Sequence, residues 1–485
     1  MLGKFLSVFT IFLLISCSEI TMGGSNKSIN SSASKFEDSI HGTYASTYVP
    51  LKSENIIIKN STLFDGNGNK FENYDIHFID GDIKALGSNL KVDNATVIDG
   101  TGKYVTPGII DNHSHMGVYP APGVSTSSDG NEATNPVTAE VWAEHSVWTQ
   151  DPQYKLALAG GITTFHVLPG SANLFGGRGV TLKNVSANTV PEMKFPGAPH
   201  SLKMACGENP KRVYRSRGPS TRMGNVAGYR SAWIGAEKFR NSLEKNPELR
   251  DLRNETLVGV LDGEILVHNH CYRADEMATM INISDEFGYK VSTFHHGVEA
   301  YKIADLLADE GICAALWADW WGFKHEAYDM SIANIAIVDQ ARGGKGCAIV
   351  HSDDASGIQR LNQEAAKAVK YGNTSQEDAW KMVTLNPAKL LHLDHRMGSV
   401  KAGKDADIVL WSANPLSVYA KVIQTYVDGK LMFDIENDKK ILKRDLQEKM
   451  RIIELMSKEK NSKIRKLKPD KEKHYHCDTI YEYEE

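Results

Sequence analysis

The residues with the clearest chemical potential close an apolar, strand-like run at 105–115, which reads Val-Thr-Pro-Gly-Ile-Ile-Asp-Asn-His-Ser-His. Side chains at positions i and i+2 of a strand point to the same face, so His113 and His115 present two imidazoles side by side. Two neutral imidazoles joined by an oxygen ligand form the mixed donor set that holds zinc while leaving a position open. The run therefore predicts a divalent-metal centre.

Histidines recur in pairs on two later segments. His268 and His270 alternate along one predicted strand and so share a face. His295 and His296 are adjacent, so alternation predicts that only one of them enters the protein interior. These pairs supply more imidazoles than a single metal ion needs.

A carboxylate ends the last apolar segment. Asp353 follows a buried-looking strand, and its neighbour Asp354 is expected to face away. A carboxylate placed near an activated water is a natural general base, which can return the proton to a leaving nitrogen.

The elements that must position these groups are short apolar strands separated by helix-length segments. Eight such strands within about 250 residues predict a (β/α)8 TIM barrel, whose active site lies at the carboxyl ends of its strands. An open doubly wound sheet is the alternative, but the glycine-rich loop expected after its first strand is missing. The candidate strands are 109–115, 162–168, 179–183, 201–206, 264–270, 290–296, 312–317 and 347–353.

Two β-rich segments flank the barrel sequence. Each has alternating strands and a hairpin signal, Asp80-Gly81 in the first and Asp428-Gly429 in the second. From the residues alone, these segments could be separate domains or two halves of one.

At this point the chain resembles the amidohydrolase superfamily, in particular its imidazolonepropionase-related and prolidase-like members, from about residue 56 to residue 434. The resemblance rests on the His-x-His run and on motifs at 160–164, 168–173, 352–353, 384–388 and 403–407. It implies a metal-dependent barrel at 108–397 and a small β-sandwich built from 53–107 and 398–435. It also implies hydrolysis of a C–N bond in a small amide, cyclic amide or dipeptide by metal-activated water. The ions would be one or two divalent metals, Zn first, with Mn or Fe as alternatives.

The resemblance also implies site residues. Carried over strand by strand, the metal ligands are His113, His115, His268, His296 and Asp353, with His296 and Asp353 also catalytic. His270 would then lie beyond the metal, near the substrate.

The fourth strand leaves three alternatives open. Lys203 stands where prolidase-like relatives carry a carboxylated lysine that bridges two metals. Glu208 is an alternative bridge, and a single metal needs neither residue. On the substrate side, Arg273 could bind a carboxylate with its planar fork, and Asn173 and Tyr272 lie in loops that could shape the pocket.

The N-terminus predicts export. An apolar run too short to span a membrane ends in Leu14-Ile15-Ser16-Cys17, which resembles a bacterial lipobox. We therefore expect residues 1–17 to act as a lipoprotein signal, with lipidation at Cys17, and residues 18–52 to be a flexible tether. Ser18 resembles the signal for outer-membrane sorting. The remaining cysteines are five and widely spaced, so mostly buried free thiols are expected.

The net charge of −5 argues against a nucleic-acid partner. Residues 436–473 hold 14 basic and 8 acidic side chains, so this stretch is +6 and the rest of the chain is −11. Apolar residues at helical spacing predict a basic helical tail over 436–485, either a solvated surface helix or a membrane-surface contact. A deaminase and an inactive binding lipoprotein stay open as alternative functions. A homo-oligomeric state also stays open.

Overall fold

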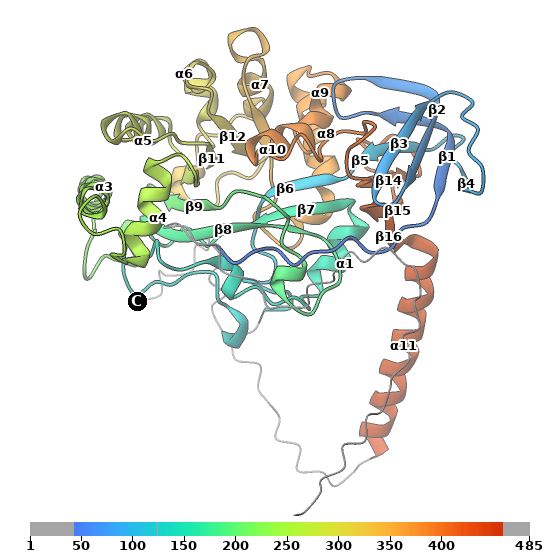
Figure 1. Ribbon diagram of the computed structural model, residues 1–485, viewed down its shortest axis with the longest axis horizontal. Coiled ribbons are helices and arrows are strands. Elements are labelled where there is room, and N and C mark those ends of the chain that lie inside the picture. The colour runs from blue at the N-terminus through green and yellow to red at the C-terminus, as the bar shows by residue number, and fades with distance from the viewer. Residues whose placement is uncertain (1–42, 124, 459–485) are drawn as a thin grey trace, which may run out of the picture.

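Eight strands form a barrel, and a second sheet lies at one side of it (Figure 1). The computed structural model describes residues 43–123 and 125–458. The predicted lipidation site Cys17, most of the predicted tether and the end of the predicted tail lie outside these residues.

The barrel strands follow one another in chain order around the sheet. Seven of them run parallel, as predicted, and their carboxyl ends meet at one mouth. The strands are β6 (Ile109–Ser114), β7 (Ile162–Val167), β8 (Phe175–Lys183), β9 (Ser201–Ala205), β10 (Leu266–Cys271), β11 (Thr293–His296), β12 (Cys313–Leu316) and β13 (Ala348–Val350).

Strand β8 differs from the prediction because it runs antiparallel to both of its neighbours. The seven residues 168–174 between β7 and β8 hold no helix. A link this short cannot make a parallel crossover, so the chain turns back as a hairpin. β8 therefore begins at the mouth of the barrel and ends with Lys183 at the opposite face.

Backbone and side-chain hydrogen bonds close the barrel between β13 and β6. The Asp353 N–H donates to the His113 carbonyl oxygen at 3.0 Å, just beyond the end of β13. The Ser352 N–H and hydroxyl both donate to the buried Asp111 carboxylate, at 3.2 and 2.5 Å. This closure places Asp353 directly beside the His-x-His strand.

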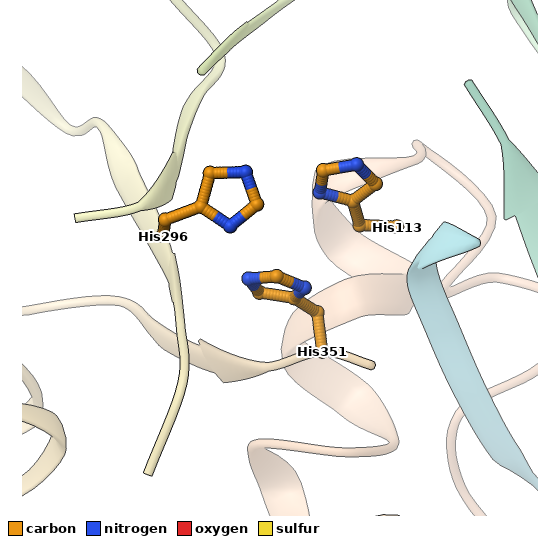
Figure 2. A group of neighbouring side chains, drawn as sticks. All are labelled: His113, His296 and His351. Carbon is orange, nitrogen blue, oxygen red and sulfur yellow. The ribbon is translucent and has the colours of Figure 1, made fainter. Parts of the chain in front are cut away.

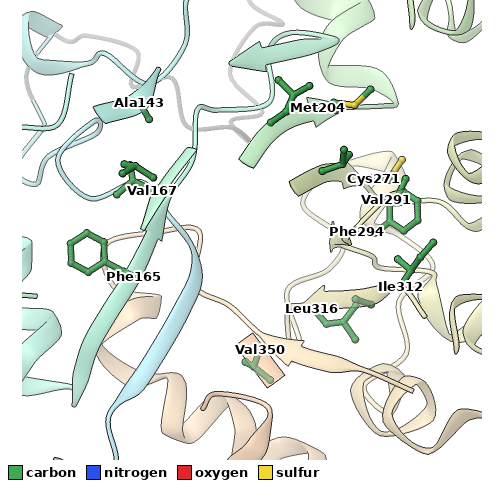
Figure 3. Close-up of a cluster of buried hydrophobic side chains, with 14 of the residues drawn as sticks. Ala143, Phe165, Val167, Met204, Cys271, Val291, Phe294, Ile312, Leu316 and Val350 are labelled. Atoms are coloured by element: carbon green, nitrogen blue, oxygen red, sulfur yellow. The ribbon is translucent and has the colours of Figure 1, made fainter. Parts of the chain in front are cut away.

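Helices cover the outside of the barrel along its parallel strands (Figure 1). Most present an apolar face to the strands, and residues such as Phe165, Phe294 and Leu316 pack in the core between the strands and the helices (Figure 3). The helices before the last are α1 (Gln153–Ala159), α2 (Glu208–Val213), α3 (Arg222–Leu243), α4 (Leu252–Leu261), α5 (Ala274–Phe287), α6 (Ala304–Glu310), α7 (Asn334–Gly344), α8 (Leu361–Gly372), α9 (Gln376–Lys381) and α10 (Leu385–Leu390). Short 3-10 turns are η1 (Ser125–Ser127), η2 (Ala143–His145), η3 (Val190–Glu192), η4 (Ala300–Ile303), η5 (His325–Ala327) and η6 (Gly357–Arg360).

The second sheet joins both ends of the barrel sequence, as the resemblance implied. Its strands are β1 (Ile56–Phe64), β2 (Lys70–Ile79), β3 (Asp82–Gly87), β4 (Thr96–Asp99), β5 (Tyr104–Pro107), β14 (Ile408–Trp411), β15 (Val422–Val427) and β16 (Lys430–Asp434). β5 pairs with β14 across 300 residues of sequence, in the register Tyr104 opposite Trp411. Hydrogen bonds connect all eight strands into one sheet, which has an apolar core of its own.

The predicted tether ends earlier than residue 52. The Lys194 ammonium donates to the Tyr44 carbonyl oxygen at 2.7 Å, and the Ser46 hydroxyl donates to the Lys194 carbonyl oxygen at 2.6 Å. The Tyr48 hydroxyl donates to Asp428 of the sheet domain. The chain is thus fixed to the barrel from about residue 44, because these contacts offset the entropy of ordering it.

The expectation of free thiols is wrong for four of the cysteines. Cys206 is bonded to Cys271, and Cys313 to Cys347. The partners are 65 and 34 residues apart in sequence, but each pair links the ends of neighbouring barrel strands. Widely spaced cysteines become adjacent because each βα unit returns the chain beside the previous strand.

The last helix, α11 (Ile435–Lys458), leads away from the body of the protein (Figure 1). None of its residues is buried. None of the helices in the described ranges has both the length and the apolar character needed to cross a membrane.

The carboxyl group of Asp339 on α7 allows the effect of a raised pKa on the stability of the fold to be tested. Burial, followed by repulsion from Asp378, raises the pKa of Asp339 to about 6. The ionised carboxylate therefore destabilises the folded state as the pH rises from about 4 through 6. Asp339→Asn should raise the free energy of unfolding at pH 7 by about 1–2 kcal/mol, and the gain should vanish near pH 4.

Thermal melts between about pH 4 and pH 7 check this expectation. Asp309→Asn is the control of opposite sign, because its hydrogen bond from Arg342 lowers the pKa of Asp309. That substitution should remove a favourable interaction at pH 7. If Asp339→Asn raised the free energy of unfolding equally at about pH 4 and pH 7, the pKa of Asp339 would not be raised as described.

Candidate metal centre and active site

Three predicted residues meet at the mouth of the barrel. The Asp353 Oδ1 atom lies 3.1 Å from His113 Nε2 and 3.0 Å from His115 Nε2. Their ligand atoms all lie within 4.8 Å of one another. The carboxyl end of β6 supplies His113 and, directly after the strand, His115, and the closure between β6 and β13 supplies the carboxylate.

A second group shares His113 and adds His296 and His351. The ligand atoms of these three histidines also lie within 4.8 Å of one another, and Figure 2 shows their rings gathered around one space. The His113 ring centroid is 5.1 Å from that of His296 and 4.9 Å from that of His351. The sequence reasoning missed His351, although its position two residues before Asp353 on the last strand was a signal for it.

The rule of alternate faces predicted the wrong orientation for His295 and Asp354, and the backbone conformation of their neighbours explains why. His296, the last residue of β11, and Asp353, which lies just beyond β13, adopt left-handed φ angles of 70° and 64°. The His295 ring centroid lies 4.4 Å from that of His113, so His295 and His296 both enter the interior, contrary to prediction. Asp354 also lines the same cavity as Asp353 instead of facing away.

The paired histidines of β10 lie at different depths. His268 Nδ1 is 3.0 Å from His295 Nε2, and the His268 ring is 4.8 Å from that of His166. The His270 ring is 4.5 Å from that of His296. The structure thus places His270, rather than the predicted ligand His268, beside the second histidine group.

Of the two proposed bridging residues, only Lys203 reaches the histidines. Its Nζ lies 3.1 Å from His113 Nε2 and donates to the Pro169 carbonyl oxygen at 3.0 Å. Glu208 begins α2 instead, and its carboxylate lies 3.8 Å from the Lys324 ammonium. The geometry leaves the Lys203 bridge and the single metal as the alternatives.

Burial controls the charge of these groups. It lowers the pKa of His113, His268, His295 and His296 well below the ordinary value, and Lys203 contributes in the same direction. These imidazoles are therefore neutral near pH 7 and keep a lone pair for a metal ion.

Asp111 positions the carboxyl end of β13. Besides its bonds from Ser352, it accepts the His113 N–H at 3.2 Å. Burial raises the pKa of Asp111 to about 7 despite these hydrogen bonds. Asp111 was in the recognised motif, but nothing in the sequence indicated this positioning role.

Of the two catalytic candidates, Asp353 opens onto a cavity of about 150 Å³. His115 and Asp353 form part of its wall, together with Tyr119 and Gln153. The space suits a small group of a substrate rather than a folded protein.

The residues predicted to bind the substrate differ in how close they lie to the histidines. Tyr272 is buried and stacks on His296, with ring centroids 5.2 Å apart, so it borders the site. Arg273 pairs with Asp275 at the exposed start of α5, at 3.0 Å. The Asn173 amide donates to backbone carbonyls and to the Tyr214 hydroxyl at 2.8 Å, which fixes the loop after β7. The structure thus brings only Tyr272 of the three to the histidines.

The donor set fits a divalent metal ion. Neutral imidazoles and one carboxylate are the ligands that Zn prefers, and they are buried at the mouth of a barrel. Neither ring nitrogen of the buried His296 has a hydrogen-bond partner among the described residues. A buried polar group without a hydrogen-bond partner costs free energy. A metal ion bound to His296 would satisfy one of its ring nitrogens.

Comparisons with known proteins agree with this geometry. The profile described as "Amidohydrolase family" matches residues 104–432. "Amidohydrolase tasK" of Hapsidospora irregularis is 33% identical over 374 residues, which cover 70% of this chain. The match spans 38% of that relative's own length. A dihydroorotase of Thermoanaerobacter sp. (strain X514) is 48% identical over 61 residues, which are 13% of this chain and 14% of the relative.

Among solved structures, an amidohydrolase from Thermotoga maritima MSB8 is similar over most of the described chain. It is 36% identical, with a TM-score of 0.73, and the match covers 78% of this chain and 100% of that one. The fold is therefore shared with a solved protein whose whole chain matches 78% of this one.

Proposed function

The chain belongs to the amidohydrolase family, and from this premise we propose that it hydrolyses a C–N bond in a small amide, cyclic amide or dipeptide. The observation that carries the proposal is the convergence of His113, His115 and Asp353, two of which, His115 and Asp353, line a cavity. The names of the relatives, amidohydrolase and dihydroorotase, support the same class of reaction.

His113, His115 and Asp353 would hold one divalent ion, and His296 with His351 could hold a second that shares His113. When bound, such an ion supplies Lewis-acid polarisation of the carbonyl and lowers the pKa of water. Zn fits these ligands first, with Mn or Fe as alternatives.

The chain's own groups handle the proton. Asp353 lines the cavity and is the acceptor for the proton that the attacking water loses. The same carboxyl group can then return that proton to the leaving nitrogen. Asp111 and Ser352 hold the backbone of Asp353 in place, and Tyr272 fixes the ring of His296 by stacking.

We also propose that the protein is exported and lipid-anchored at Cys17. The two disulfides support export, because such bonds persist in oxidising compartments and are rare in the cytosol. Outer-membrane location and a homo-oligomeric state stay predictions.

Metal analysis combined with a substrate screen tests the proposed reaction. We expect purified protein to contain about one or two Zn, Mn or Fe ions per chain. A panel of dipeptides, N-acyl amino acids and hydantoin-like rings should show turnover that a chelator abolishes and added metal restores. His113→Ala should lose the metal, whereas His392→Ala, an exposed histidine, should keep it.

The screen also separates the alternatives. Release of ammonia from a ring without opening of an amide would indicate a deaminase. A protein that holds no metal and turns over nothing after metal is added would contradict the enzyme proposal and favour a binding role.

A further inference from the structure

Helix α11 exposes a continuous apolar stripe. The stripe residues recur every three or four positions, so they share one face of the helix. Their exposed fractions are 57% for Leu442, 59% for Leu446, 63% for Met450, 53% for Ile453 and 54% for Met456. Nothing among the described residues covers this face.

The charges beside the stripe are unbalanced. Each of the five acidic residues of α11 already pairs with a base: Glu436 with Lys439, Asp438 with Lys155 of α1, Asp445 with Arg444, Glu448 with Arg451, and Glu454 with Lys458. Within the described residues, Lys440, Lys443 and Lys449 pair with no carboxylate. Three positive charges thus lie uncompensated on a helix that exposes an apolar stripe.

The body holds only the start of the helix. The Lys155 ammonium reaches Asp438 at 2.6 Å, and the Asn437 N–H donates to Asp434 at 2.9 Å. A helix of 24 residues is about 36 Å long, so most of α11 extends beyond the protein (Figure 1). The stripe is therefore accessible to a flat surface.

We propose that α11 lies on the surface of a bilayer that contains anionic lipids. The apolar stripe would enter the boundary between headgroups and acyl chains, and Lys440, Lys443 and Lys449 would contact lipid phosphates. The basic sequence continues after the helix, which adds to the same attraction.

A second copy of the chain fits the stripe less well. In a coiled coil the seam would run through positions 439, 442, 446, 449, 453 and 456, and would thus bury Lys439 and Lys449. Buried lysines are costly at such positions, whereas at a membrane their long side chains can reach the headgroups.

Vesicle binding tests the proposal. The protein is produced from Ser18 onward, so that neither the apolar leader nor a lipid contributes, and every described residue remains. Sedimentation compares vesicles of phosphatidylcholine alone with vesicles that also contain phosphatidylglycerol. We expect binding to the anionic vesicles that weakens as salt is added.

A charge-matched pair of variants isolates the stripe. Leu446→Glu with Ile453→Glu should reduce binding to the anionic vesicles at least about tenfold. Asn437→Glu with Gln447→Glu adds the same charge at exposed positions outside the stripe, and should change binding by less than about threefold. All positions are exposed, so circular dichroism should show the same fold.

Three results would overturn the proposal. The first is a parent protein that does not sediment with anionic vesicles, and the second is a stripe variant that binds them as well as the parent does. The third is a parent that light scattering shows to be a dimer and that the stripe variant converts to a monomer, because a second copy would then be the occupant.

Discussion

Asp353→Asn should lower kcat/KM about a thousandfold, which corresponds to roughly 4 kcal/mol of lost transition-state stabilisation. Asparagine is isosteric but cannot accept a proton near neutral pH. The backbone should not change, because asparagine tolerates the left-handed φ of 64° that Asp353 adopts. The Asp353 N–H can still donate to the His113 carbonyl oxygen, so the barrel closure remains.

The neighbouring residue offers a matched control. Asp354 lines the same cavity, but its Oδ1 atom accepts the Gly357 N–H at 2.9 Å in a local turn. Asp354→Asn should lower kcat/KM by less than about tenfold. Kinetics on the best substrate of the screen, with metal content measured for each protein, check both changes. Full activity in Asp353→Asn would show that Asp353 does not carry the proton.

Much of the fold could be predicted because the strand pattern is strong. All eight barrel strands lie where apolar runs of the sequence predicted them, and the two flanking segments pair with each other. The exception is the direction of β8. Its apolar pattern is the same for a parallel and an antiparallel strand, and only the length of the preceding link distinguishes the two.

The site was predictable where strand alternation holds and unpredictable where it ends. His113 lies inside β6 and His115 directly follows it, so their orientation followed from spacing. His296 and Asp353 lie at strand ends with positive φ, where the rule of alternate faces no longer applies. His295 therefore joins the cluster as well.

Tertiary pairing produced the remaining differences. The disulfide partners, and the contacts of residues 44–48 with the barrel, depend on which strands become neighbours. The exposure of Arg273 has a local cause, because Asp275 two residues later pairs with it. Spacing along the sequence carries little information on which strands become neighbours, and therefore on the disulfides and on the contacts of residues 44–48.

The end of β8 holds a buried charge cluster that joins the barrel to the sheet domain. Lys183 is fully buried, and its ammonium lies 2.8 Å from the Asp405 carboxylate and 3.6 Å from that of Asp407. It also donates to Asp428, which in turn accepts the Tyr48 hydroxyl. The three carboxylates are close enough to hold a metal ion, but the ammonium already supplies the positive charge between them.

Lys183→Met should lower the free energy of unfolding by about 3–5 kcal/mol. Methionine fills a similar volume, so the main effect is to leave the buried carboxylates of Asp407 and Asp428 without their counter-charge, whereas Asp405 keeps its pair with Arg396. A lower midpoint in urea unfolding would report the loss. The Tyr48 contact depends on the same carboxylates, so proteolysis near residue 48 should also become faster.

An exposed lysine supplies the matched control. Lys84 pairs with Asp82 at 2.8 Å on the surface, so Lys84→Met removes the same kind of ion pair where water screens it. The midpoint of Lys84→Met should stay close to that of the parent. Adding Asp407→Asn to Lys183→Met should restore part of the lost stability, because one buried negative charge is removed. If Lys183→Met were as stable as Lys84→Met, the cluster would not hold the two domains together.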